Sequence, residues 1–537
     1  MSVFDYRRRK TTTTTVGKVK IGSGYPVRVQ SMNNTSTMDT EASAAQAERI
    51  ARAGADIDRL TAQGVREARN LGEIRGRLRA AGCDIPLVAD IHFNPKAACA
   101  AAEVVEKVRI NPGNFVDPGR TFVKLEYTDE EYAGELRKIT DTFAPFLRLC
   151  REHGTAIRIG VNHGSLSDRI MSRYGDTPAG MVESAMEFLR VAVKEDFNDI
   201  VISIKASNTV VMVETVRLLV SAMDREGMAF PLHLGVTEAG DGEDGRVRSA
   251  AGIGTLLAEG IGDTIRVSLS EEPEAEVPVA RELAAYIAAR EYAPAIEGDF
   301  APGYDPLRPE RRQSDPVGNV GGGNVPVVVG LDVIPSEGIA VIETSHPNPL
   351  GDISARVHRM TAEGDRRPVI ARIAYPGASA EQVVIRAAAD FGALLLNGLI
   401  DGMEIVSDAL SPEELARLSL SIMQATRRRI SKTEFVSCPG CGRTLFDLQQ
   451  TVKRVKAATS HLKGLKIAVM GCVVNGPGEM ADADYGYVGA AAGKISLYRG
   501  KECVEKNIPS DEAVGRLIEI IRSDGKWREP ETAGTAV

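Results

Sequence analysis

The chain has few cysteines, few aromatic residues and no long apolar run. Its 537 residues include 7 cysteines and 1 tryptophan, and aromatic side chains make up 5% of the total. Cysteines this sparse cannot form the dense disulfide framework of a small secreted domain. No apolar run reaches the roughly 18 residues that a membrane-spanning helix needs, so the sequence predicts no membrane partner.

An excess of positive charge and a targeting segment are also missing. The 65 basic side chains stand against 73 acidic ones, a net charge of -8, which does not indicate a nucleic-acid-binding surface. The first residues, MSVFDYRRRKTTTTT, are basic with no hydrophobic region behind them, unlike a secretory signal. We therefore expect a cytoplasmic protein of two or three domains with a small-molecule partner.

Short β-branched runs alternate with Ala-, Glu- and Arg-rich stretches of helical period through residues 1–296. This alternation is typical of repeated βα units. Eight such units in roughly 290 residues predict a TIM (β/α)8 barrel, within an α/β fold class. The predicted strands are 27–32, 57–60, 86–93, 106–112, 157–164, 200–208, 232–240 and 264–270.

The carboxyl ends of these strands, where barrel enzymes carry their catalytic groups, are strongly polar. The cations there are Arg59, Arg109, Arg158, Lys205 and Arg266. Charges that face the inside of a barrel need partners, so these cations together predict a highly charged anion such as a diphosphate. The alternative is that each cation caps a strand or pairs with an acidic neighbour. The other polar residues predicted at the mouth are Asp90, His92, Asn111, Asn162, His163, Ser207, Asn208 and Ser268.

One carboxylate, Glu238, follows the seventh predicted strand and would lie within this ring of cations. A carboxylate beside a bound anion is a candidate general acid or base, because such surroundings shift its pKa. The alternative is a structural ion pair with one of the arginines. We interpret Glu238 as a catalytic residue.

Two further domains are predicted beyond the barrel. A stretch rich in proline, glycine and aspartate at 297–324 indicates a linker, and strand-like runs in 325–430 predict an inserted α/β spacer domain. Residues 392–406 align with 254–268 of the barrel, and two interpretations stay open: a degenerate βα repeat, or chance similarity of two Leu- and Gly-rich segments. Residues 431–524 predict an α+β domain that starts with a helix at 443–458, and 525–537 a flexible tail.

Three late cysteines form the clearest motif of the last domain. Cys438 and Cys441 make a C-x-x-C pair, and Cys472 follows a strand-like run. Three metal sites fit this spacing: a zinc site completed by His461, a 4Fe-4S cluster completed by Cys503, and a cluster with three thiolates and a weaker ligand from the NGPGE loop. The spacing favours iron over zinc only slightly.

Long motifs along the whole chain resemble the 4-hydroxy-3-methylbut-2-en-1-yl diphosphate synthase family. They are ADIHF, KVRINPGN, RIGVNHGSLSDR, KASN, LHLGVTEAG, SCPGCGRTLFDL and GCVVNGPGE. LEYTDEEYAGEL and GEDGR in the barrel segment, together with the inserted domain, resemble the large form of plants and some bacteria. The resemblance implies reductive ring opening and dehydration of 2-C-methyl-D-erythritol 2,4-cyclodiphosphate to 4-hydroxy-3-methylbut-2-en-1-yl diphosphate, in the methylerythritol phosphate route to isoprenoids.

The resemblance also implies a 4Fe-4S cluster held by Cys438, Cys441, Cys472 and Glu479, so that the last domain, 431–524, is an iron-sulfur domain. A carboxylate is a hard ligand on a soft cluster, so the iron bound by Glu479 is expected to be the exchangeable one. We therefore interpret Glu479 as a catalytic residue as well as a ligand.

Ferredoxin or flavodoxin is the expected electron donor. Three arginines, Arg427 to Arg429, precede the cysteine motif in a chain that is acidic as a whole. They predict a docking surface for an acidic carrier, with a role in folding or domain closure as the alternative. In the short form the cluster comes from a partner subunit. A homodimer and a single chain whose spacer lets it reach its own barrel therefore both stay open.

Overall fold

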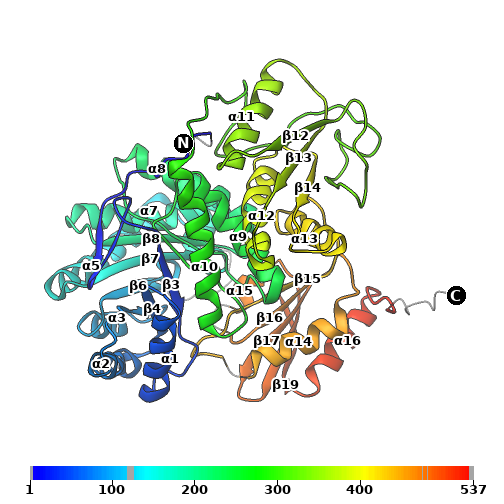
Figure 1. Cartoon of the computed structure of the whole chain (residues 1–537). Coiled ribbons are helices and arrows are strands. Elements are labelled where there is room, and N and C mark those ends of the chain that lie inside the picture. Colours follow the sequence, from blue (N-terminus) through cyan, green and yellow to red (C-terminus); the bar gives the residue numbers. More distant parts are fainter. Residues whose placement is uncertain (1–3, 118–125, 445, 474–475, 481, 531–537) are drawn as a thin grey trace.

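The computed structural model describes residues 4–117, 126–444, 446–473, 476–480 and 482–530. It contains the three predicted domains: a barrel, a spacer and a C-terminal domain with the cysteine motifs, here called the cluster domain. Figure 1 shows the barrel beside the cluster domain, with the spacer above both. Within the described residues, no helix is long and apolar enough to cross a membrane.

Eight parallel strands form the barrel, each at a predicted position. Their order is β8-β7-β6-β5-β4-β3-β10-β9, and a parallel bridge between Ile202 and Leu232 brings β8 beside β9 and closes the ring. The TIM barrel prediction is confirmed. The strands are β3 (Arg28–Met32), β4 (Ile57–Thr61), β5 (Leu87–Asp90), β6 (Lys107–Ile110), β7 (Ala156–Asn162), β8 (Ile200–Lys205), β9 (His233–Leu234) and β10 (Thr264–Ile265).

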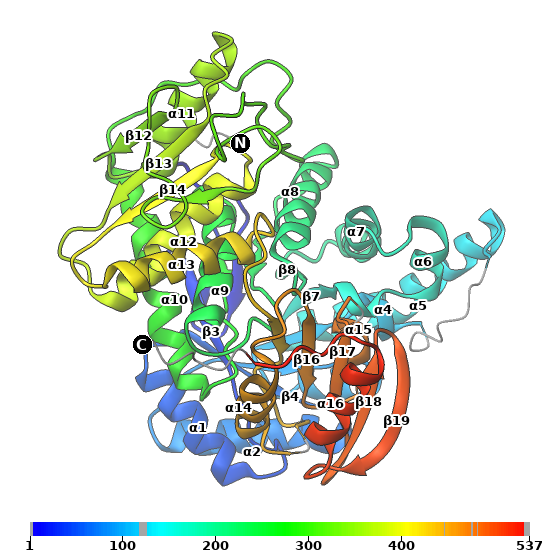
Figure 2. The same ribbon diagram turned by 90° about the vertical axis from the view of Figure 1, so that its right-hand side faces the viewer.

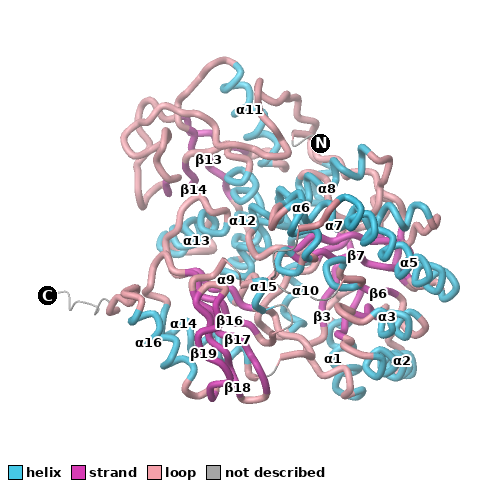
Figure 3. Tube along the Cα trace, turned by 180° about the vertical axis from the view of Figure 1, so that it is seen from behind, coloured by secondary structure: helices cyan, strands magenta, loops and turns pink. Residues whose placement is uncertain are grey.

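Helices surround these strands, as the tube view from behind shows (Figure 3). Several begin at side-chain caps; Asn94, for example, accepts the backbone N–H groups of Lys96 and Ala97. The helices of the barrel domain are α1 (Thr40–Arg52), α2 (Val65–Ala80), α3 (Pro95–Ala102), α4 (Pro112–Phe115), α5 (Asp129–His153), η1 (His163–Ser165), α6 (Asp168–Tyr174), α7 (Pro178–Lys194), α8 (Thr209–Arg225), α9 (Gly242–Ala258), α10 (Pro273–Ala288) and η2 (Ala289–Tyr292).

An N-terminal hairpin closes one end of the barrel. Its strands, β1 (Thr14–Val16) and β2 (Val19–Ile21), are antiparallel. Val16 and Ile21 pack in an apolar cluster with residues at the amino ends of the barrel strands, such as Ile57 and Ala156. In the described part of the chain, this cluster fills the amino end of the barrel, which leaves the carboxyl end of the strands for a ligand.

The spacer is a four-stranded parallel sheet with the order β11-β14-β13-β12. Its helix α12 lies against α9 of the barrel domain (Figure 1). Glycines allow this close approach, because a Cβ on Gly254 would lie 2.7 Å from the Cβ of Ala389. The elements of the spacer are β11 (Val327–Val328), β12 (Ala340–Thr344), α11 (Pro349–Ala362), β13 (Val369–Ala374), α12 (Ala380–Leu396), β14 (Gly402–Val406) and α13 (Pro412–Ala425).

The spacer repeats part of the barrel, which supports the repeat interpretation over chance similarity. Asp263 of the barrel accepts the backbone N–H of Leu232 and pairs with Arg8. The aligned Asp401 accepts the N–H of Val369 and pairs with Arg311. The strand order of the spacer, β11-β14-β13-β12, corresponds to β3-β10-β9-β8 of the barrel, so the spacer resembles half of a barrel.

The predicted linker at 297–324 contains no named helix or strand, and its whole length is described. It nevertheless packs against the spacer. The ring of Tyr304 stands edge-on to that of His358, with centroids 4.5 Å apart, and Ser314 donates to Asp401 at 3.1 Å. The linker is therefore part of the packed structure and not a loose tether.

The cluster domain carries a five-stranded sheet in the order β15-β16-β17-β18-β19. The strand and hairpin follow the sequence prediction, but the helix predicted from residue 443 begins at Leu448, because Asp447 caps it. Residues 526–529 of the predicted tail pack on the domain, for Lys526 pairs with Asp484. The elements are β15 (Glu434–Ser437), α14 (Leu448–Thr459), β16 (Lys466–Met470), α15 (Gly476–Glu479), β17 (Tyr485–Ala491), β18 (Lys494–Arg499), β19 (Glu502–Pro509) and α16 (Ala513–Ser523).

The cluster domain lies over the open end of the barrel of its own chain (Figure 2). A parallel bridge joins Ala239, after β9, to Ser437 at the end of β15. Ser270 donates to the carbonyl of Cys438 at 2.9 Å, and Arg248 donates to the carbonyl of Phe435 at 3.2 Å. One chain thus brings both halves of the site together, the arrangement for which a spacer was expected.

Candidate active site at the barrel mouth

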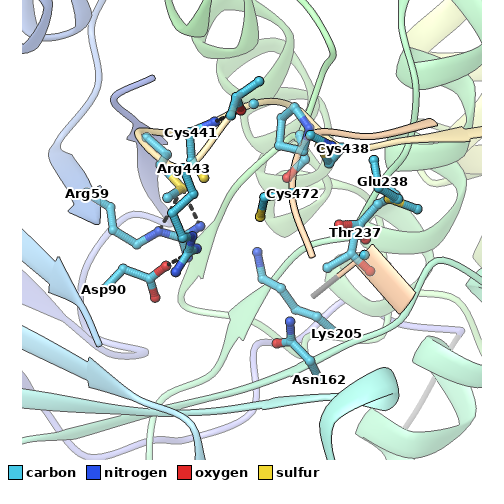
Figure 4. Close-up of a pocket in the computed structure, with 18 of the residues that line it drawn as sticks. Arg59, Asp90, Asn162, Lys205, Thr237, Glu238, Cys438, Cys441, Arg443 and Cys472 are labelled. Carbon is cyan, nitrogen blue, oxygen red and sulfur yellow. Dashed lines mark hydrogen bonds and ion pairs between the residues drawn. The ribbon is translucent and has the colours of Figure 1, made fainter. Parts of the chain in front are cut away.

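A cavity lies between the barrel mouth and the cluster domain. Figure 4 shows the cysteines of the cluster domain facing Lys205 and Asn162 of the barrel. The predicted residues that line the cavity are Arg59, Asp90, His92, Arg109, Arg158, Asn162, Lys205, Glu238, Arg266, Ser268, Cys438, Cys441 and Cys472. The barrel-strand ends and the cysteine motifs therefore belong to one site.

Arg109 is the most firmly held cation of the cavity. It donates to Oδ1 of Asp90 at 3.0 Å, to the carbonyl of Gly160 at 2.9 Å and to Oδ1 of Asn162 at 3.0 Å. The backbone leaves room for it, because a Cβ at residue 160 would lie 2.5 Å from Nε of Arg109. Its orientation is thus fixed before any ligand binds.

Two other arginines have different partners. Arg266 makes a bidentate pair with Glu276, at 3.0 and 2.9 Å, so for this residue the alternative of an acidic neighbour is realised. Arg59 donates to the thioether sulfur of Met32, at 3.2 and 2.7 Å, and a sulfur is a weak acceptor. The carboxylate that acts on Arg59 is Asp90, which also accepts from Arg109, so one carboxylate is shared between two arginines.

Arg158 and Lys205 are buried cations, 1% and 5% exposed. The atoms Nε and Nη1 of Arg158 have no hydrogen-bond partner among the described residues. Burial lowers the pKa of both side chains, and neighbouring arginines lower both pKa values further. Such crowding of like charge is unfavourable without a counter-ion, so the cavity is suited to a multiply charged anion.

Asp90 and His92 carry different charges although they lie side by side. Burial alone would raise the pKa of Asp90, but Arg59 and Arg109 outweigh it and hold that pKa well below its usual value. Burial, assisted by Arg109, lowers the pKa of His92 to about 3. At neutral pH the site therefore contains a carboxylate that orients arginines and a neutral imidazole.

Glu238 lies at the junction of the barrel and the cluster domain. Its backbone has a φ of 49°, a left-handed conformation that is uncommon for a residue other than glycine. Its carbonyl accepts from Arg248 at 3.3 Å, and the same guanidinium group holds Phe435 of the cluster domain. Backbone strain of this kind is concentrated at functional sites, and here the side chain lines the cavity.

The three cysteines fit the thiolate ligands of a 4Fe-4S cluster. Cys438, Cys441 and Cys472 line one cavity, and the backbone N–H of Gly471 donates to Sγ of Cys438 at 3.2 Å. Burial raises the pKa of Cys438 to about 12, so only a bound metal would keep it as a thiolate. A Cβ at residue 471 would lie 2.9 Å from Oγ1 of Thr444, so glycine keeps this cradle open.

A single-ion site is not present among the described residues, where no three side chains of His, Cys, Asp or Glu are grouped to hold one metal. In a 4Fe-4S cluster each thiolate binds a different iron, so its ligands lie farther apart than those of one ion. His461 is outside the cavity, edge-on to Trp527, and Cys503 lies on β19 near the carbonyl of Glu505. These positions disfavour both the zinc site and the fourth thiolate.

Glu479 is the last residue of α15, and Gly476, the first residue of that helix, lines the cavity. The side chain of Glu479 lies outside the described part of the structure, as does Asn475. The backbone thus brings the NGPGE loop to the cluster side of the cavity. Its role as fourth ligand stays a prediction.

The other predicted mouth residues do not line the cavity. Asn111 and Asn208 cap helices α4 and α8 by accepting backbone N–H groups. His163 lies beside Asp176, with 3.2 Å between Nε2 and Oδ1. Ser207 is buried, 8% exposed, next to the cap. All four residues come at or after the ends of barrel strands, but the start of the next helix turns their side chains away from the cavity.

Several cavity residues were not singled out from the sequence. Met32, Thr237, Thr444 and Arg443 all line it. Met32 ends a predicted strand, Thr237 lies within one, and Arg443 follows Cys441 within the cysteine motif, so their positions were available as a signal. Their side-chain directions were not, because these depend on how the two domains meet.

The arginine triplet before the cysteine motif is engaged within the chain. Arg427 pairs with Glu434 and Arg429 with Asp332, while Arg428 donates to the carbonyl of Leu395 at 2.9 Å. These contacts join the cluster domain and the segment before it to the spacer. They favour the alternative that the triplet serves folding or domain closure.

Comparisons with known proteins agree with this architecture. Two family models match: the GcpE TIM-barrel domain over residues 11–281 and the GcpE protein C-terminal domain over residues 434–523. A Bacteroides fragilis protein named 4-hydroxy-3-methylbut-2-en-1-yl diphosphate synthase (flavodoxin) is 53% identical, covering 98% of each chain. Proteins of the same name from Porphyromonas gingivalis and Akkermansia muciniphila are 47% and 44% identical, covering 98% and 99% of this chain and 100% and 99% of their own.

Proposed function

Because this chain belongs to the family of 4-hydroxy-3-methylbut-2-en-1-yl diphosphate synthases, we propose that the cavity holds the cyclic diphosphate on its barrel cations, facing a 4Fe-4S cluster. The chain is an oxidoreductase of isoprenoid biosynthesis. It converts 2-C-methyl-D-erythritol 2,4-cyclodiphosphate to 4-hydroxy-3-methylbut-2-en-1-yl diphosphate, with uptake of two electrons and two protons and release of water. The observation that carries the assignment is one cavity lined by these cations and by the three cysteines.

The barrel supplies binding and orientation. Arg59, Arg158 and Lys205 line the cavity, and Nε and Nη1 of Arg158 have no hydrogen-bond partner among the described residues, so the proposed contribution of these cations is to hold the diphosphate group. Arg109 is preoriented by Asp90 and Asn162, which reduces the entropy lost on binding. The cluster domain covers the mouth and excludes water from the substrate.

Cys438, Cys441 and Cys472 would hold the cluster, with Glu479 as the fourth ligand. When bound, the cluster supplies electrons one at a time, which no side chain of this chain can do. Glu238 lines the cavity beside the cysteine loop and is the proposed proton donor and acceptor for the substrate oxygen. The neutral His92 donates or accepts a hydrogen bond according to its tautomer.

The proposed electron donor is flavodoxin or ferredoxin, since the relatives are named for flavodoxin. Lys453 and Arg454 are exposed on α14, at the surface of the cluster domain, where they would attract an acidic carrier. A homodimer stays a prediction, although the structure brings each cluster domain to its own barrel without a partner.

Anaerobic purification followed by metal analysis and assay tests the function directly. We expect about four irons and matching sulfide per chain, and conversion of the cyclodiphosphate in the presence of reduced flavodoxin. Stoichiometric zinc without sulfide would contradict the cluster assignment. A cluster-loaded protein that leaves the cyclodiphosphate unchanged would contradict the substrate assignment.

A further inference from the structure

Arg443 differs from the other cations of the cavity because it comes from the cluster domain. It follows Cys441 by two residues and lies buried between the two domains, with its side chain 8% exposed. Its Nη2 donates to Oδ2 of Asp90, at the end of β5, at 3.3 Å. Figure 4 shows Arg443 reaching from the cysteine loop towards Arg59 and Asp90.

The backbone before Arg443 is pressed against the barrel. A Cβ at Gly442 would lie 2.7 Å from the carbonyl oxygen of Thr35 and 2.8 Å from Oγ1 of Thr61. Only glycine fits this contact, so the close approach fixes the position of the cysteine loop against the carboxyl end of the barrel.

Asp90 connects the two domains through its two oxygens. Oδ1 accepts from Arg109, a barrel cation, and Oδ2 accepts from Arg443. The side chains of Asp90 and Arg443 are 3% and 8% exposed. Removing Asp90 would leave the buried guanidinium of Arg443 without this carboxylate, and removing Arg443 would leave Oδ2 of Asp90 without its donor while Oδ1 keeps Arg109. Either change weakens the buried contact between the two domains.

We propose that Arg443 is a positioning residue that, through Asp90, holds the cluster domain closed over the barrel and aligns the cysteine loop with the anion site. It does not act as a further ligand of the diphosphate. The alignment of the cysteine loop with the anion site rests on the proposed function, whereas the closure of the cluster domain over the barrel does not. An arginine suits this role because its planar guanidinium is always charged and binds a carboxylate with a fixed geometry.

Hydrogen exchange of the substrate-free holoenzyme tests the closure. In Arg443→Met and in Asp90→Asn we expect residues 33–37 and 438–444 to exchange about tenfold faster or more, since the contact that protects both segments is lost. Arg443→Met could lose the cluster, because Arg443 lies in the cysteine loop. Asp90 lies outside that loop, so Asp90→Asn still tests the closure in a protein that keeps its cluster. Unchanged exchange in Asp90→Asn would overturn the proposal.

Lys456→Met is the matched control. Lys456 also joins the two domains, through Asp241, but this pair is peripheral, with side chains 23% and 22% exposed. Water screens this partly exposed pair more than the buried Arg443–Asp90 pair, so exchange at 438–444 should stay close to the wild-type rate. Equal acceleration in all three variants would overturn the specific role of the Arg443–Asp90 pair.

Affinity and turnover separate positioning from ligand binding. For Arg443→Met we expect the affinity for inorganic pyrophosphate to stay within about threefold, because the barrel cations remain, while kcat falls about tenfold or more. Arg443→Lys should recover part of the exchange protection and of kcat. A loss of pyrophosphate affinity as large as the loss of kcat would make Arg443 a direct anion ligand and overturn the proposal.

Discussion

Gly160 faces the guanidinium of Arg109 so closely that a Cβ at residue 160 would lie 2.5 Å from Nε. The same substituent would lie 3.2 Å from Oγ of Ser203, so neither side offers space. Arg109 cannot simply swing away, because Asp90 and Asn162 hold it. The glycine therefore sets the position of a cation that is proposed to bind the substrate.

Gly160→Ala should weaken pyrophosphate binding by about tenfold or more, since a charged hydrogen bond is worth roughly 1.5–3 kcal/mol. Calorimetric titration of the folded protein measures this. Gly24→Ala is the control, because no atom lies within 4 Å of a Cβ there. Equal affinities of the two variants would show that Arg109 adapts without cost.

Glu238→Gln should lower kcat by roughly 100-fold to 10,000-fold while the cluster absorbance stays unchanged, because an amide cannot exchange a proton with the substrate. The size of the side chain is retained, so the contact of its backbone with Arg248 should persist. Turnover at the wild-type rate would return Glu238 to the role of a structural carboxylate.

Cys472→Ser should remove the cluster, whereas Cys503→Ser should leave about four irons per chain, since Cys503 lies outside the cavity. Glu479→Ser should keep the three thiolates but change the spectroscopic signature of one iron. Iron and sulfide analysis with Mössbauer spectroscopy measures both effects. Loss of iron in Cys503→Ser would revive a ligand set of four thiolates.

Asp58→Asn should stabilise the protein at pH 8 but not at pH 4. Burial raises the pKa of Asp58 to about 7, against roughly 3.9 in an unfolded chain. Between these values the folded state retains a proton that the unfolded state has lost, so the contribution of Asp58 to the free energy of unfolding falls as pH rises. Above pH 7 the ionised group costs up to about 4 kcal/mol, at 1.36 kcal/mol per pKa unit.

Thermal unfolding at both pH values measures the Asp58 effect. Asp84→Asn is the control, because Asp84 is exposed beside Lys18 and its removal should change the melting temperature little. A stabilisation by Asp58→Asn that is the same at pH 4 and pH 8 would contradict the ionisation argument.

Arg429→Gln should lower turnover driven by flavodoxin and by a small chemical reductant to the same extent, and should lower the melting temperature. Its ion pair with Asp332 fastens the segment before the cluster domain to the spacer. A selective loss with flavodoxin at low salt would instead support carrier docking, because such steering is screened by salt. Lys453→Gln, on the exposed face of α14, provides the comparison.

The sequence by itself determined the eight barrel strands, the cations at their ends and the cysteine motifs. These are written in short-range patterns: apolar alternation at a period of two, helical periodicity and fixed spacing. The similarity of the spacer to the barrel could also be seen in the sequence, because Gly398 and Asp401 align with Gly260 and Asp263.

Only the tertiary structure decided which of these side chains act together. Asn208 and Arg158 both belong to predicted barrel strands, yet one caps a helix and the other enters the cavity. The pairing of Arg443 with Asp90 joins residues 353 positions apart in the chain. Such pairings depend on how packed domains meet, and that is set by the summed burial of many distant residues and not by any local pattern.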